Sequence, residues 1–132
     1  MINKNTKLFM VIASLMMALT IAIGAFGAHG LKPYLDGYST GIYEKAVSYQ
    51  FYNTLGLFFI SFISYLLPKS KKIITSFYFI LLGTITFSFS LYILAITKIM
   101  WLGAITPIGG SFMIIGWVLA GYLIFKELKI DA

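Results

Sequence analysis

The feature that most constrains this chain is the position of its charges. Four long stretches contain no Lys, Arg, Asp or Glu: residues 8–28, 46–67, 73–97 and 99–125. About 20 apolar residues span the roughly 30 Å hydrocarbon core of a bilayer, so each stretch is long enough to cross one. Because lipid offers backbone amides no hydrogen-bond partner, segments that cross it are helical. The sequence therefore predicts an all-α, four-transmembrane-helix bundle with helices over about 8–28, 41–67, 73–97 and 107–125.

Composition agrees with a single integral membrane domain over residues 1–132. Hydrophobic residues make up 60% of the chain and charged residues only 11%, too few to cover a soluble fold of this size. The net charge of +6 comes from lysines beside the predicted spans, and no Arg is present for bidentate phosphate recognition. We therefore expect membrane lipids, not nucleic acid, as the anionic partner. The chain has no Cys, which excludes disulfides and thiolate metal sites, and no cofactor is predicted.

The lysines also predict the orientation of the bundle. An even number of spans places both termini on one side, together with most of the lysines: Lys4, Lys7, Lys69, Lys71, Lys72, Lys126 and Lys129. The other side holds Lys32, Lys45 and Lys98. Loops rich in Lys stay in the cytoplasm, so both termini are predicted to be cytoplasmic. A cleaved secretory signal at the N-terminus is the alternative, but the first apolar run is long for one and three more spans follow.

Helix contacts and helix starts can be predicted from small and polar residues. We expect Gly83, Gly109 and Gly116 at close contacts between helices, because small residues let helix backbones approach each other in lipid. A polar stripe on the second span is expected to face inward: Gln50, Thr54, Ser61 and Ser64. Ser39 or Thr40 is expected to cap the second helix, and Thr106, followed by Pro, the fourth.

Seven polar or titratable residues are predicted to gather in the outer half of the membrane: His29, Glu44, Gln50, Asn53, Ser90, Tyr92 and Thr106. Each lies near the end or the start of a span on the same side of the bundle. Since polar side chains inside a bilayer face the bundle interior, we expect His29, Gln50, Asn53 and Tyr92 to line one concavity that opens outward. Such a pocket would suit an amphipathic ligand, for example a lipid headgroup. In the alternative, Gln50 and Asn53 only hold neighbouring helices together.

Several strings resemble those of a known family: Gly24-Ala25-Phe26-Gly27-Ala28-His29, Glu44-x4-Tyr49-Gln50-x3-Thr54-Leu55, Phe87-Ser88-x-Ser90-Leu91-Tyr92, Thr106-Pro107-x-Gly109-Gly110 and Gly116-Trp117. Over nearly its whole length the chain resembles the small four-helix membrane proteins called the domain of unknown function 423 family, to which the transmembrane protein 256 group is related. The resemblance implies a multi-pass protein of the bacterial plasma membrane and no particular activity. In two departures, Asn53 stands where the family often has His, and Phe89 where it often has Gly. Since His29 is the only histidine, a metal or haem site built on paired histidines is disfavoured.

Three functions compete on the sequence alone. The first is a non-enzymatic membrane protein that interacts with lipid, with a partner protein or with a second copy through the outer polar residues. The second is a small transporter or channel subunit, although no span contains a carboxylate of the kind that proton relays use. The third is a membrane enzyme using His29 and Glu44, although these two residues offer little acid–base chemistry. We favour the first.

Overall fold

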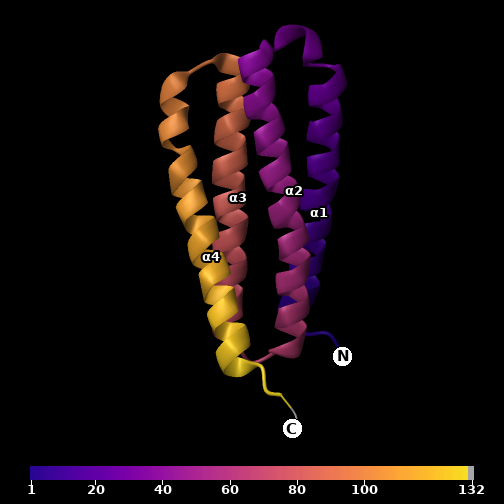
Figure 1. Cartoon of the computed structure of the whole chain (residues 1–132). Helices are drawn as coiled ribbons and strands as arrows, with labels where there is room; N and C mark the ends of the chain where they lie inside the picture. Colours follow the sequence, from indigo (N-terminus) through magenta and orange to yellow (C-terminus); the bar gives the residue numbers. More distant parts are fainter. Residues whose placement is uncertain (131–132) are drawn as a thin grey trace.

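The computed structural model describes residues 1–130 and consists of an antiparallel bundle of long helices (Figure 1). The helices are α1 (Lys4–His29), α2 (Gly37–Leu66), α3 (Lys71–Thr97) and α4 (Thr106–Glu127), with short 3-10 helices η1 (Lys32–Tyr34) and η2 (Met100–Ala104). No strand occurs within residues 1–130. We call the end with both termini and the α2–α3 turn the terminal end. The opposite end, with residues 30–36 and 98–105, is the loop end.

Helix boundaries follow from capping and correct the predicted helix starts. The carboxylate of Asp36 accepts a hydrogen bond from the Ser39 backbone N–H at 2.8 Å, so α2 begins at Gly37 and neither Ser39 nor Thr40 is the cap. The predicted cap at Thr106 is also wrong. Helix η2 leads through Ile105, which already has helical dihedral angles, directly into α4. The Thr106 side chain is therefore inside the helix and free to bond elsewhere.

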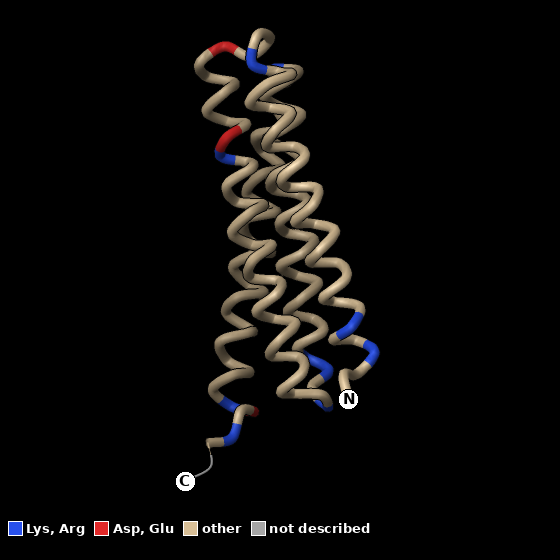
Figure 2. Tube along the Cα trace, turned by 90° about the vertical axis from the view of Figure 1, so that its right-hand side faces the viewer, with Lys and Arg blue, Asp and Glu red and all other residues tan. Residues whose placement is uncertain are grey.

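Three helical segments within residues 1–130 are long and apolar enough to cross a membrane: α1, α3 and Met100–Glu127. Helix α2 is not among them, because Gln50, Asn53 and several Tyr and Ser residues lower its hydropathy. Even so, α2 has 30 residues and runs beside the others from one end of the bundle to the other (Figure 1). Charged residues gather toward the two ends and leave an uncharged middle (Figure 2).

Helix α3 is the central packing element of the bundle. It packs against α2 on one side and α4 on the other, while α1 packs mainly against α2. Near the terminal end α1 also reaches α3, where the rings of Phe9 and Phe77 stack with centroids 3.8 Å apart. One apolar cluster around Phe77 fills the terminal half, and a second around Tyr92 fills the loop half. Between them lies a layer of buried polar side chains: Gln50, Asn53, Thr54, Thr84 and Ser88.

The contact between α3 and α4 depends on glycines, as predicted. A Cβ atom on Gly83 would lie 2.7 Å from the Gly109 carbonyl oxygen, and one on Gly109 would lie 2.4 Å from the Phe87 backbone nitrogen. At Gly116 a Cβ would lie 2.6 Å from Ile80 Cγ1 and 3.0 Å from the Ile80 nitrogen. In the same region Ser76 donates a hydrogen bond to the Gly116 carbonyl at 2.8 Å. The two backbones therefore touch, and no side chain fits between them.

We predict that Gly116→Leu lowers the free energy of unfolding, because the new side chain must displace backbone. The expected loss is about 1–3 kcal/mol or more, as is typical of overpacked helix contacts. Unfolding in mixed detergent micelles, followed by circular dichroism, measures the change. Gly121→Leu is the matched control, since a Cβ there meets nothing within 4 Å. Equal stability of the two variants would contradict the tight α3–α4 contact.

Candidate functional site

The seven residues predicted to form one cluster are divided among separate places. His29 is exposed at the end of α1, and Glu44 is exposed on the first turns of α2. The other five are buried and bond in pairs or to neighbouring residues: Gln50, Asn53, Ser90, Tyr92 and Thr106. None of the pockets described within residues 1–130 is lined by more than one of the four residues predicted to share a concavity, His29, Gln50, Asn53 and Tyr92. Helical rotation directs Gln50 and Asn53 toward different neighbouring helices.

Gln50 and Tyr92 join α2 to α3 inside the bundle. The Tyr92 hydroxyl donates to Gln50 Oε1 at 2.7 Å, and Gln50 has no exposed surface. Just beside them the Ser88 hydroxyl donates to the Ala46 carbonyl at 2.8 Å. Three buried polar atoms on α2 have no hydrogen-bond partner within residues 1–130: Ser39 Oγ, Gln50 Nε2 and Thr54 Oγ1. Most side chains of this polar layer thus bond another helix. This agrees with the alternative prediction that Gln50 only holds neighbouring helices together.

Asn53 joins α2 to α4. The Trp117 indole N–H donates to Asn53 Oδ1 at 2.9 Å, and Asn53 Nδ2 donates to the Tyr49 carbonyl at 3.0 Å. The indole crosses between the helices because Gly56 leaves room for it: a Cβ on Gly56 would lie 2.2 Å from the ring. The sequence alone does not identify this partner of Trp117, since 64 residues separate the two side chains.

Ser90 and Thr106 form the third buried pair, which attaches the start of α4 to α3. Their hydroxyl oxygens lie 2.8 Å apart, and Ser90 also donates to the Phe87 carbonyl at 2.8 Å. Thr106 has no side-chain capping bond and makes this contact instead.

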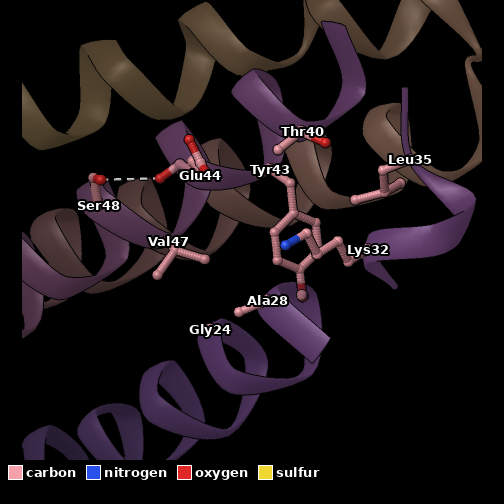
Figure 3. A pocket seen from close by; sticks show the side chains of 10 residues that line it. Gly24, Ala28, Lys32, Leu35, Thr40, Tyr43, Glu44, Val47 and Ser48 are labelled. Carbon is pink, nitrogen blue, oxygen red and sulfur yellow. Dashed lines mark hydrogen bonds between the residues drawn. The ribbon is translucent and has the colours of Figure 1, made fainter. Parts of the chain in front are cut away.

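A pocket of about 490 Å³ lies between α1 and α2 at the loop end (Figure 3). We call it the α1–α2 pocket. It is lined by Gly24, Gly27, Ala28, Lys32, Leu35, Thr40, Tyr43, Glu44, Val47 and Ser48. Of the predicted cluster only Glu44 contributes to it; His29 does not. The pocket combines two charged side chains with hydroxyls and an apolar wall.

Tyr43 and Gly27 build the floor of the pocket. The Tyr43 hydroxyl donates to the Ile23 carbonyl of α1 at 2.7 Å, and 5% of the residue is exposed. Its ring occupies the place of a side chain on α1, since a Cβ on Gly27 would lie 2.1 Å from the ring. Helix α1 continues through Gly27 to His29. The signal missed was the spacing Gly24-x-x-Gly27, which leaves one side of α1 open to α2.

An ion pair connects the segment that follows the pocket-lining residue Leu35 to the end of α3. Lys98 Nζ lies 2.5 Å from Asp36 Oδ2, and this is the one ion pair found across residues 1–130. Asp36 follows Leu35, which lines the pocket. The hydrogen bond from Lys98, and then that from Ser39, lowers the pKa of Asp36 from 3.8 to about 2. Because the pKa of Asp36 is lowered on folding, its ionised carboxylate stabilises the fold above the ordinary pKa of an aspartate. This stabilisation is lost only as the pH falls toward 2, so the ion pair with Lys98 persists near neutral pH.

Fold and site together define a helical membrane protein with a polar pocket at one end and no group of three or more metal-ligating side chains within residues 1–130. A family described as "Protein of unknown function (DUF423)" matches residues 23–110, and the chain belongs to this family. It is similar to a UPF0382 membrane protein of Staphylococcus haemolyticus, with 44% identity over 91% of this chain and 97% of the relative.

A second relative comes from another bacterial genus. The UPF0382 membrane protein YwdK of Bacillus subtilis is 37% identical over 86% of this chain and 92% of its own length. A UPF0382 membrane protein of Staphylococcus epidermidis is 42% identical over 93% of this chain. No solved structure matches this chain. The relatives thus agree on a bacterial membrane protein, as the sequence resemblance implied.

We predict that Tyr92→Phe lowers the free energy of unfolding by about 1–3 kcal/mol, because Gln50 Oε1 is left buried without a donor. Unfolding in mixed micelles measures the loss. Adding Gln50→Leu to Tyr92→Phe should cost less than the sum of the single changes, since both partners are then apolar. Tyr52→Phe is the control, because Tyr52 is 64% exposed. Strictly additive effects would contradict the bond.

Proposed function

We propose that this chain crosses a bacterial plasma membrane four times with both termini in the cytoplasm. We further propose that it is not an enzyme and binds a membrane lipid in the α1–α2 pocket. The observation that carries the proposal is the make-up of that pocket, in which Lys32 and Glu44 adjoin the apolar surface of Val47 and Tyr43. A membrane lipid likewise has a charged headgroup followed by apolar chains.

The four-span arrangement is supported by the packing of α2. This helix lies between α1 and α3, both of which are apolar enough to cross a membrane, and runs the length of the bundle (Figure 1). Its two amide side chains are covered: Gln50 and Asn53 are buried against α3 and α4. A helix whose amide side chains face its neighbouring helices is compatible with lipid on its outer side.

The orientation is supported by the charge distribution at the two ends (Figure 2). The terminal end carries seven of the ten lysines, those at positions 4, 7, 69, 71, 72, 126 and 129, and the loop end carries the other three. The lysine-rich end stays in the cytoplasm. The α1–α2 pocket would then lie at the outer surface of the membrane.

Lipid binding is favoured over catalysis by the position of His29. An acid–base pair must share a site with its substrate. His29 is exposed and does not line the pocket to which Glu44 contributes. The pocket supplies charges and hydroxyls for holding a headgroup, but it contains neither a histidine nor a nucleophile activated by a base.

The orientation predicts opposite labelling of two single-cysteine variants. Tyr34→Cys at the loop end, where the native side chain is 81% exposed, should react with an impermeant thiol reagent in intact cells. Lys69→Cys in the α2–α3 turn should react only after the cells are opened. The native chain has no Cys and is the blank. Labelling in the reverse order would overturn the orientation.

Filling the pocket should abolish lipid retention. We predict that Ala28→Phe, on the pocket wall, loses the phospholipid that stays bound after gentle detergent purification, as measured by native mass spectrometry. Ala25→Phe is the matched control, because Ala25 is an exposed alanine of the same helix that does not line the pocket. If both variants keep the same lipid as the native chain, the pocket is not the binding site.

A further inference from the structure

The α1–α2 pocket holds two opposite charges that do not neutralise each other. Lys32 and Glu44 both line it, yet Asp36–Lys98 is the one ion pair across residues 1–130. An ammonium and a carboxylate that share one pocket without pairing each remain available to a ligand. Figure 3 shows the two side chains apart, with Glu44 from α2 on the side of Ser48 and Lys32, from the η1 segment, reaching toward Tyr43.

No other charged side chain lines the pocket, so its formal charge is zero. An anionic headgroup would gain the attraction of Lys32 but would place its negative charge beside Glu44. A cationic headgroup would meet the reverse problem. A headgroup with both a phosphate and an ammonium satisfies both residues at once, which is the charge complementarity that sets specificity.

We propose, on the basis of the lipid-binding function proposed above, that the pocket selects a zwitterionic phospholipid. Lys32 binds the phosphate and Glu44 binds the ammonium. Thr40 lines the same space, and its hydroxyl makes no hydrogen bond within residues 1–130, so it serves as an additional donor to the phosphate. Ser48 is already committed, since its hydroxyl donates to the Glu44 backbone carbonyl at 2.9 Å.

The apolar side of the pocket takes the start of the lipid chains. Gly24 lies less than two helical turns before the end of α1, and Val47 lies about three turns after the start of α2, so both lie toward the middle of the bundle. A Cβ on Gly24 would lie 3.3 Å from Val47 Cγ1, so this glycine keeps the lower edge of the pocket open. Headgroup and chains are thus placed in the order in which a bilayer presents them.

The test compares two phospholipids of equal chain length on the full chain in detergent: phosphatidylethanolamine, which is zwitterionic, and phosphatidylglycerol, which is anionic. We expect the native chain to prefer phosphatidylethanolamine. Lys32→Gln and Glu44→Gln should each weaken its binding about tenfold, as loss of one charge-assisted hydrogen bond does. Glu44→Gln should instead strengthen binding of phosphatidylglycerol. Lys45→Gln, beside Glu44 but outside the pocket, should change neither affinity.

Three results would overturn the inference in distinguishable ways. If the native chain prefers phosphatidylglycerol and Glu44→Gln tightens both lipids, the zwitterion assignment is wrong while lipid binding stands. If soluble phosphoethanolamine competes as well as the whole lipid, the ligand is a free headgroup and the chains are irrelevant. If neither lipid responds to Ala28→Phe, the proposed function of the pocket itself fails.

Discussion

Hydrogen bonding in the absence of water is the constraint on which the rest of this bundle depends. A polar group inside an uncharged helix bundle must find its partner on another helix or on its own backbone. Ser76 bonds the Gly116 carbonyl, and Ser88 bonds the Ala46 carbonyl, each from α3 to a neighbouring helix. Tyr92 and Trp117 do the same through Gln50 and Asn53. These bonds fix the rotation of each helix about its axis, which apolar packing alone leaves variable.

Glycines let the helices approach closely enough for these hydrogen bonds to form. Where α3 meets α4, the backbones touch at Gly83 and Gly109, and a serine hydroxyl can reach across. Where α1 meets α2, Gly27 admits the ring of Tyr43, whose hydroxyl bonds back to α1. Glycines thus bring α3 and α4 into contact along their length, whereas between α1 and α2 they leave a pocket next to the Tyr43 ring. The proposed lipid site is a product of that difference.

The loop end differs from the terminal end in how its charges are used. Asp36 both caps α2 and pairs with Lys98, a residue held in the left-handed backbone conformation at the end of α3. Two loops far apart in sequence are thereby joined. Lys32 and Glu44 stay outside this arrangement although they lie in the same region. Because they are unpaired and lie beside a segment held by the Asp36–Lys98 ion pair, Lys32 and Glu44 are suited to ligand binding. The lysines of the terminal end are suited to setting the orientation of the bundle in the membrane.

Much of the architecture follows from the sequence, because length, hydropathy and charge position are local properties. The uncharged stretches determine where the helices lie, and the spacing of Gly83, Gly109 and Gly116 determines where α3 and α4 touch. The tertiary structure alone decided which polar residues meet. Gln50 and Asn53 are three residues apart, yet their side chains bond different helices, a matter of helix rotation and neighbour order. For the same reason His29 and Glu44 do not share a site, and Lys32, which no motif singled out, lines a pocket with Tyr43.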